Sequence, residues 1–282
     1  MRRLMYSVYL TVLCSLTTIH VTAQTTFTNT SGDQLWLNAA NWDNGLPSDG
    51  NDPTIPAGFT VLLSPSADYP FDFDVTNNGM LTINLGNANV TNGGLPARTF
   101  TNSGTVTING GGNGIFTNLN TFDNTGTGSI INNATFIDNG VAILNNEGNI
   151  ENTAFFQQNG TIVSNGGTII NAVCATFRAE DNSIGSLTPN YVNNGITYII
   201  GSASLNVTQN NGVILNDPAA SPQPTAVCIP TPLEVVLDVN GMASITVDDF
   251  DAGSSADYCP IVNRFLTQVD FNCSDLGDNT AT

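Results

Sequence analysis

Four aspartates lie close together near the C-terminal end of this sequence. They are Asp248, Asp249, Asp251 and Asp257, and Gly253 lies among them. Calcium binds carboxylate and carbonyl oxygens, so a loop of this composition could hold a calcium ion. The order DDFDAG differs from the D-x-D-x-D-G spacing of an EF-hand loop, however. We therefore expect a solvated acidic loop and no cofactor, with a calcium site as the alternative.

Two glutamates, Glu147 and Glu151, form a second pattern that could do chemistry, because glycoside hydrolases use paired carboxyl groups on either side of the bond they cleave. We expect both to face solvent at corners of a repeat structure. Outside its first twenty residues the chain has no histidine and no lysine, which removes the usual general bases and zinc ligands. Arg98 and Arg178, which could serve as a lyase base, are isolated in the sequence. We predict that the protein is not an enzyme.

Trp36 and Trp42 are the only tryptophans of the chain, and both lie in the segment 24–70. Two indole rings could form a platform on which a sugar stacks. The alternative is that they fill the core of a cap, because an open repeat structure exposes its core and its strand edges at the end. We expect the cap.

The same segment resembles the entry segment of many large secreted bacterial β-helix proteins and, more loosely, the start of G8-type modules. The residues that carry this resemblance are Trp36, Asn41-Trp42, Gly45, Pro47, Asp52, Ile55-Pro56, Gly58 and Val61.

The first 23 residues have the layout of a secretory signal peptide. Arg2 and Arg3 precede a mostly apolar stretch over 4–19, and the small residues Val21-Thr22-Ala23 follow it. The apolar stretch is shorter than the ~20 residues that a membrane-spanning helix needs, so a membrane anchor is the less favoured alternative. We expect a protein that is secreted or held on the outer surface of a bacterium, without membrane insertion after removal of the signal.

Net charge narrows the choice of partners. Without the leader, the chain keeps three of its five cationic residues against 23 acidic ones. Nucleic acids and anionic membrane surfaces are bound through clustered lysines and arginines, so we exclude both as partners. An extracellular glycan or a surface protein stays open.

A period of twenty residues predicts the fold that positions all these groups. It is seen in two series of equivalent residues: Phe116, Phe136 and Phe156, and Ile130, Ile150 and Ile170. Apolar residues alternate with polar ones inside each unit, and Asn-Gly steps provide corners because both residues tolerate a positive φ. Stacked coils would pair their strands and align asparagines into hydrogen-bonded ladders.

We therefore predict an all-β protein built on a right-handed parallel β-helix with coils of about twenty residues. A hairpin meander folded into a sandwich or barrel is the alternative, since Asn-Gly is also a hairpin signal. The chain divides into a signal peptide (1–23), a cap (24–70), β-helix repeats (71–216), a proline-rich linker (217–226) and a C-terminal module (227–282).

Two alternating runs around Asn240-Gly241 predict a hairpin in the C-terminal module. The module resembles the HYR-type, immunoglobulin-like repeat of large exported bacterial surface proteins. The matching segments are Ala226-Val227-Cys228, Leu237-Asp238-Val239-Asn240-Gly241, Gly253-Ser254-Ser255, Asp257-Tyr258-Cys259 and Phe271-Asn272-Cys273-Ser274-Asp275-Leu276-Gly277. The resemblance implies a β-sandwich that is truncated here. One departure is Tyr258-Cys259-Pro260, where the family tends to have Asn-Cys-Gly.

Four cysteines follow the leader, and an oxidising compartment favours disulfides. We expect Cys259 to pair with Cys273, which leaves Cys228 without the partner that the family resemblance implies. Cys174 lies in the repeats and is expected as a buried thiol, with pairing to Cys228 as the alternative. The function expected from all these features is that of a non-catalytic structural or adhesion protein, and a carbohydrate-binding or polysaccharide-cleaving β-helix is the alternative.

Overall fold

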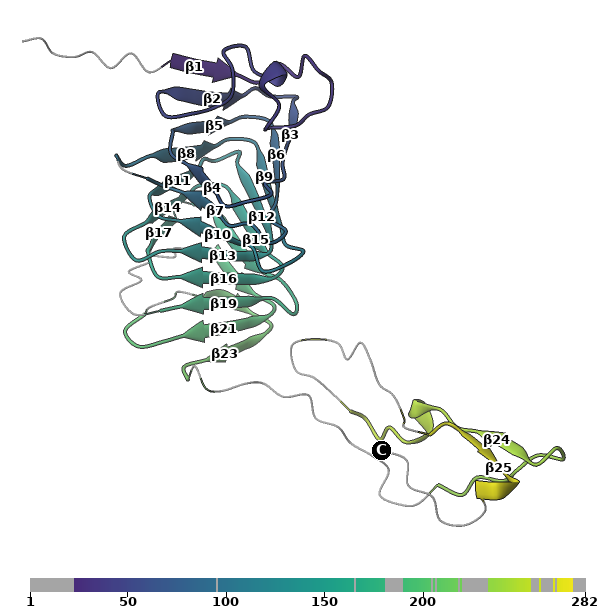
Figure 1. Ribbon diagram of the computed structural model, residues 1–282. Helices are drawn as coiled ribbons and strands as arrows, with labels where there is room; N and C mark the ends of the chain where they lie inside the picture. The colour runs from purple at the N-terminus through teal and green to yellow at the C-terminus, as the bar shows by residue number, and fades with distance from the viewer. Residues whose placement is uncertain are drawn as a thin grey trace, which may run out of the picture.

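The computed structural model describes residues 23–94, 96–164, 166–180, 190–203, 205, 207–217, 219, 233–254, 259, 266 and 268–275. The predicted signal peptide (except for its last residue), most of the linker, and Cys228 lie outside these residues. The main body is a parallel β-solenoid of about seven turns (Figure 1). The β-helix prediction is therefore confirmed and the hairpin meander is wrong, while the handedness of the coil stays a prediction.

Three parallel sheets form the sides of the solenoid, and the turns from β2 to β19 each contribute one strand to each sheet, while the last strands, β20 to β23, belong to only two of them. Sheet A contains β1 (Ala23–Thr26), β2 (Asn51–Ile55), β5 (Val75–Asn77), β8 (Thr99–Asn102), β11 (Thr121–Asn124), β14 (Ile143–Asn146) and β17 (Thr161–Ser164). Sheet B contains β3 (Thr60–Leu63), β6 (Met80–Asn84), β9 (Thr105–Asn109), β12 (Ser129–Asn133), β15 (Asn149–Asn152), β18 (Thr168–Asn171), β20 (Asn190–Asn193) and β22 (Val207–Asn210). Sheet C contains β4 (Tyr69–Phe71), β7 (Val90–Asn92), β10 (Ile115–Asn118), β13 (Thr135–Asp138), β16 (Phe155–Gln158), β19 (Thr176–Ala179), β21 (Ile196–Ile199) and β23 (Val213–Leu215).

Most coil strands place two side chains inside the solenoid, because side chains alternate between the two faces of a strand. In β11, for example, Phe122 and Asn124 are buried, while Thr121 and Asp123 are partly exposed. The inward apolar side chains stack from turn to turn. The rings of Phe136 and Phe156 are 4.6 Å apart, with an angle of 9° between their planes. The period of twenty is confirmed for this phenylalanine series, whose members pair directly between strands.

The isoleucine series follows the period only in part. Ile130 pairs with Ile150 in the neighbouring strand, but Ile150 pairs with Ile169. Ile170 faces outward opposite Glu151 because the turn before it is one residue shorter. The packing of side chains inside the solenoid therefore decides which residues pair between strands, and the number of residues in a corner varies to allow it.

Amide side chains, all buried except Asn210, occupy the second inward position and form three ladders along the solenoid, one of which ends at the carboxyl group of Asp138. In the bonds between rungs, an Nδ2 donates to the Oδ1 of the rung in the next turn, over distances of 2.7–2.9 Å. Ladder A runs through Asn77, Asn102, Asn124 and Asn146; ladder B through Asn132, Asn152, Asn171, Asn193 and Asn210; and ladder C through Asn92, Asn118 and Asp138. The same Nδ2 atoms also donate to the backbone carbonyl that begins the strand after the next rung. Asn124, for example, donates to Asn146 on β14 and to the carbonyl of Asn149, the first residue of β15. The ladders satisfy amides that would be costly to bury alone.

Glycines make the corner between sheets A and B close enough for this stacking. A Cβ atom added to Gly148 would lie 2.1 Å from the carbonyl oxygen of Gly128, and one added to Gly104 would lie 2.0 Å from that of Gly79. Backbone atoms occupy the space where a side chain would go. The chain therefore needs glycine here because successive corners are in contact, without any requirement for a positive φ.

The N-terminal segment carries an aromatic cluster that packs against the first turn of the solenoid. It includes β1 and the short 3-10 helix η1 (Ala39–Asn41). The Trp36 and Trp42 rings meet edge to face at 5.0 Å, and Trp36 also contacts Phe71 of the first turn. The cap core is thus continuous with the solenoid core.

The C-terminal residues that the structure describes contain a small antiparallel sheet. It pairs β24 (Met242–Ser244) with β25 (Asp270–Asn272), next to the 3-10 helices η2 (Val247–Asp249) and η3 (Cys273–Asp275). The expected turn forms at Asn240-Gly241, where Gly241 has a φ of 75°. The predicted hairpin is wrong, however, because residues 233–238 form no strand and β24 takes its partner from thirty residues downstream.

We predict that replacing Asn124 by alanine lowers the free energy of unfolding by about 2–4 kcal/mol, because the neighbouring amide and the carbonyl of Asn149 lose their buried partner. Asn149→Ala removes an exposed amide from the outer face and serves as the matched control, with an expected change of less than about 0.5 kcal/mol. Urea unfolding followed by circular dichroism measures both. Equal stability of the two variants would contradict the role given to the ladder.

Candidate functional site

The outer face of sheet A carries rows of short polar side chains in register. One row runs across neighbouring strands through Thr54, Thr76, Thr101, Asp123, Asn145 and Val163. A second row contains Thr99, Thr121, Ile143 and Thr161. The rows follow from the alternation that buries phenylalanine and asparagine on the other face of the same strands. Neighbouring strands lie about 4.8 Å apart, so the threonine hydroxyls repeat at that spacing, except where Asp123, Asn145, Ile143 or Val163 takes the position.

An open groove of about 330 Å³ lies where the first row meets the corner between sheets A and B. It is lined by Thr101, Asp123, Asn124, Thr125, Asn145 and Glu147. Two of these side chains are carboxylates, Asp123 from β11 and Glu147 from the corner after β14. The remaining groups are hydroxyls and amides, so the groove offers hydrogen-bond acceptors and donors with a negative charge at its rim.

Hydrogen bonds within the wall hold the groove in shape. The Asn145 Nδ2 donates to Asp123 Oδ1 at 2.5 Å. The Thr125 hydroxyl donates to the carbonyl of Asn102 at 3.2 Å and is 2.9 Å from the hydroxyl of Ser103. The backbone N–H of Glu147 donates to the carbonyl of Asn124 at 2.8 Å, which fixes the corner that carries the second carboxylate. This arrangement can bind a neutral polyhydroxylated molecule through hydrogen bonds.

Sequence reasoning identified Glu147 but missed Asp123 and Asn145. The signal was present in the spacing of 22 between TFTN at Thr99 and TFDN at Thr121, which places Asp123 in register with Thr101. The other glutamate of the predicted pair, Glu151, lies on the outer face of sheet B, opposite Ile131 and Ile170. The structure therefore separates Glu147 and Glu151 and brings Glu147 to the same groove as Asp123.

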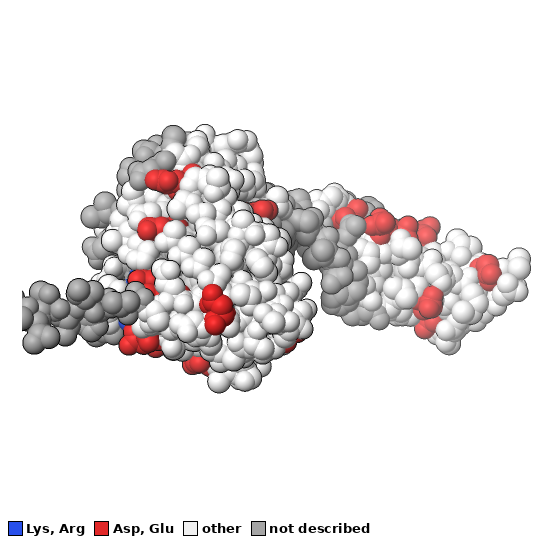
Figure 2. All heavy atoms as spheres, turned by 90° about the horizontal axis from the view of Figure 1, so that it is seen from above, with Lys and Arg blue, Asp and Glu red and all other residues white. Residues whose placement is uncertain are grey.

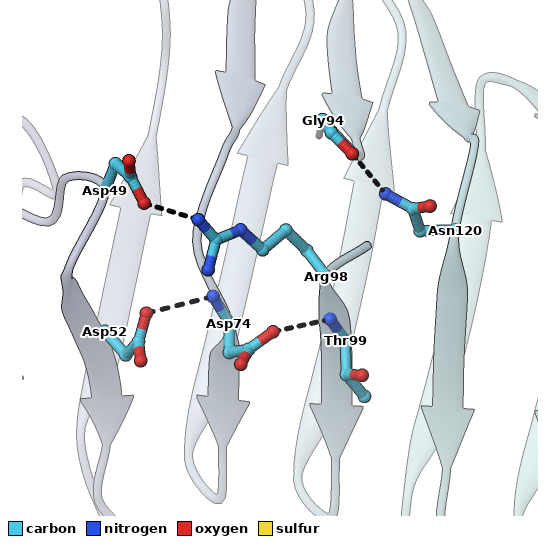
Figure 3. Close-up of polar contacts among 7 residues, drawn as sticks. All are labelled: Asp49, Asp52, Asp74, Gly94, Arg98, Thr99 and Asn120. Atoms are coloured by element: carbon cyan, nitrogen blue, oxygen red, sulfur yellow. Dashed lines mark hydrogen bonds and ion pairs between the residues drawn. The ribbon is translucent and has the colours of Figure 1, made fainter. Parts of the chain in front are cut away.

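A second group of carboxylates lies at the beginning of the sheet A strands (Figure 3). Asp52 accepts a hydrogen bond from the backbone N–H of Asp74, and Asp74 accepts one from that of Thr99. Arg98 forms an ion pair with Asp49 from the cap region. Burial raises the pKa of Asp52, with the nearby charge of Asp74 adding to the effect. The carboxylates of Asp52 and Asp74 each accept a hydrogen bond from a backbone N–H group of the next turn, so we assign these acids a structural role.

Acidic groups form separate patches on a surface that is mostly uncharged (Figure 2). Among the residues that the structure describes, no group of three or more histidine, cysteine, aspartate or glutamate side chains is placed to hold a metal ion. Asp249, from the acidic loop for which calcium binding was the alternative, accepts hydrogen bonds from the backbone N–H and the hydroxyl of Thr246, and the backbone bond lowers its pKa. Asp251 accepts from the N–H groups of Gly253 and Ser254, while Asp257 lies outside the described residues.

The two tryptophans offer no binding surface. Trp36 is 0% exposed and Trp42 is 4% exposed. The Trp36 Nε1 donates to the Tyr69 hydroxyl and the Trp42 Nε1 donates to the carbonyl of Trp36, both at 2.8 Å. Their interpretation as a sugar-stacking platform is wrong, because both rings are buried in the aromatic cluster and both N–H groups already have hydrogen-bond partners.

Cysteine pairing differs from the prediction. Cys174 forms a disulfide with Cys259, and Cys273 is a free, exposed thiol. Cys174 has a φ of 68° and follows the exposed Val173 in the corner between sheets B and C, so its side chain is not part of the solenoid core. The predicted pair of Cys259 with Cys273 and the expected buried thiol at Cys174 are therefore both wrong. Sequence spacing gave no sign of this pair because 85 residues separate its members.

Comparison of the chain with family models, curated proteins and solved structures finds no match. The part of the chain that the structure describes contains no helix of the length and apolar character needed to cross a membrane.

We predict that alkylation of the unreduced protein labels Cys273 and leaves Cys174 and Cys259 unlabelled, because these two are joined. Peptide mapping by mass spectrometry should then find a peptide that contains both cysteines and separates on reduction. The variant Cys273→Ser is the control and should keep the same linked peptide. A linked Cys259–Cys273 peptide would contradict the structure.

Proposed function

We propose that this chain is a non-catalytic, exported structural or adhesion protein. The observation that carries the proposal is the outer face of sheet A, where short polar side chains, mostly threonines, lie in register along a solenoid held by internal ladders. A repeating polar face on a rigid support suits contact with an extended partner at the cell surface. The layout of the first 23 residues supports export.

The C-terminal residues have a proposed role as a β-sandwich module of the HYR, immunoglobulin-like type. Their resemblance to that family and the antiparallel pair β24–β25 support this role. The disulfide between Cys174 and Cys259 joins this segment to the solenoid covalently. A spacer that presents a second module at a surface would benefit from such a covalent connection, since it resists separation of the two parts.

Carbohydrate binding at the groove is the second candidate function. Its support is the groove itself, in which Asp123, Asn145 and Glu147 offer the acceptors and donors that sugar hydroxyls need. A neutral glycan is the ligand class that fits, because a negatively charged rim disfavours acidic sugars. Cleavage would require Asp123 and Glu147 to act as a pair on the bond between two sugars.

Binding to immobilised neutral polysaccharides tests the two candidates with the full chain. If the groove binds glycans, Asp123→Ala should weaken binding at least about tenfold, as expected for the loss of a charged hydrogen-bond partner. Glu151→Gln changes a carboxylate on sheet B and should bind like the wild type. Binding that is equal in all three proteins would exclude the groove, while no binding by any of them would leave the scaffold role as the preferred function.

Product analysis of the same incubations separates binding from cleavage. We expect no release of reducing sugar by the wild type. Release that disappears in both Asp123→Asn and Glu147→Gln would overturn the non-catalytic proposal and assign the two carboxylates to hydrolysis.

A further inference from the structure

Asp138 interrupts ladder C with a carboxyl group in a place where other rungs have an amide. Its Oδ1 accepts from the Asn118 Nδ2 at 2.8 Å, as the Oδ1 of an asparagine rung would. Its Oδ2 therefore takes the place of the donor Nδ2. The residue is 0% exposed, and Oδ2 has no hydrogen-bond partner. A buried polar atom without a partner is rare enough to require an explanation.

The surroundings of Oδ2 are rich in acceptors. In other rungs, the Nδ2 donates to the amide of the next rung and to the carbonyl at the start of the strand that follows that next rung. The equivalent groups for Asp138 are Gln158, its strand partner, and Thr161, the first residue of β17. A Cβ atom built on Gly160 would lie 2.6 Å from Oδ2, and 2.4 and 2.7 Å from the carbonyl oxygens of Asn139 and Ala142. Oxygen atoms thus gather at a place that suits a donor.

We propose that Asp138 is a proton-binding site inside the solenoid. Its protonated carboxyl group acts as a rung of ladder C, and ionisation removes the hydrogen bond that this rung donates to the next turn. In the neutral form, the Oδ2–H group donates to an acceptor of the next turn and completes the ladder. In the ionised form, a buried negative charge faces acceptor oxygens and keeps only the bond from Asn118. The inference does not rest on the proposed function, because it concerns the interior alone.

The neighbours of the carboxyl on the elements packed against it are uncharged. They are Asn118 on β10, Gln158 on β16, and Asn139, Ala142 and Gly160 in the corners. Burial raises the pKa of Asp138 to about 7, and the bond from Asn118 opposes this rise. No acidic or basic side chain contributes to the shift. The geometry and the pKa therefore agree on a carboxyl that is neutral in mildly acidic solution.

The direction of the pH dependence follows from the raised pKa. The folded chain holds the proton up to about pH 7, while the unfolded chain releases it near the ordinary value of 3.8. The stabilising contribution is complete below pH 3.8, falls as the pH rises between these two values, and stays at its minimum above about pH 7. Over this range the equilibrium constant for unfolding rises by up to about tenfold per pH unit.

Urea unfolding of the full chain between pH 4.5 and 8, as measured for the wild type and Asp138→Asn, tests the proposal. The asparagine variant has a permanent donor in the rung. At pH 8, we expect the equilibrium constant for unfolding of this variant to be on the order of tenfold or more smaller than that of the wild type. The ratio of the two constants should shrink by up to about tenfold for each pH unit of acidification. Glu151→Gln, which removes an exposed carboxyl, should follow the wild type at every pH.

Infrared spectroscopy provides a direct readout of the proton. The folded wild type at pH 6 should show the carbonyl band of a protonated carboxyl that is lost above pH 8 and is missing from Asp138→Asn. The proposal is overturned if wild type and Asp138→Asn show parallel pH profiles, if Asp138→Asn is equally destabilised at pH 5 and pH 8, or if the protonated band is absent.

Discussion

Most turns of the solenoid depend on amide side chains that are buried in its interior and take their hydrogen-bond partners mainly from the turns before and after. An amide without a partner in such a place costs on the order of 1–3 kcal/mol. A shift of register by one residue would expose the amides of a strand and bury threonines in their place. The ladders therefore select one pairing of strands, while the stacked phenylalanines belong to the continuous apolar core.

Because the constraint acts on the interior, the corners are free to vary in length. Successive rungs of ladder A are separated by 25, 22 and 22 residues, and those of ladder B by 20, 19, 22 and 17. The hydrogen bonds keep nearly the same length throughout. The outer faces are equally free, since Thr101, Asp123 and Asn145 occupy equivalent positions with no change in the strands that carry them. A groove can thus arise by surface substitutions alone.

This division explains which features the sequence could predict. The phenylalanine period and the asparagine ladders are properties of the interior, where each residue repeats the environment of its predecessor, and both were predicted correctly. The isoleucine series failed at Ile170 because corner length is not conserved between turns. The groove depends on side chains from different turns, and the disulfide joins distant segments. The disulfide leaves no local pattern, and the groove is indicated only by the spacing of 22 between TFTN and TFDN, which a search for a period of twenty does not detect.

The ladders also have a direction, and that direction accounts for the atoms they leave without partners. Each Nδ2 donates toward the C-terminal end, so the first rung of a ladder has an Oδ1 with no donor behind it. Asn77 and Asn92 are the first rungs of ladders A and C, and their strand partners in the preceding turn are the apolar residues Ile55 and Phe71. The buried Oδ1 of each of these two asparagines has no hydrogen-bond partner. In ladder B, by contrast, the first rung accepts from the backbone N–H of Ala134. Unpartnered ladder atoms therefore occur where a ladder starts against an apolar residue or where its chemistry changes, as at Asp138. A solenoid of this type is weakest at the ends of its polar rows, because the interior rungs are satisfied on both sides.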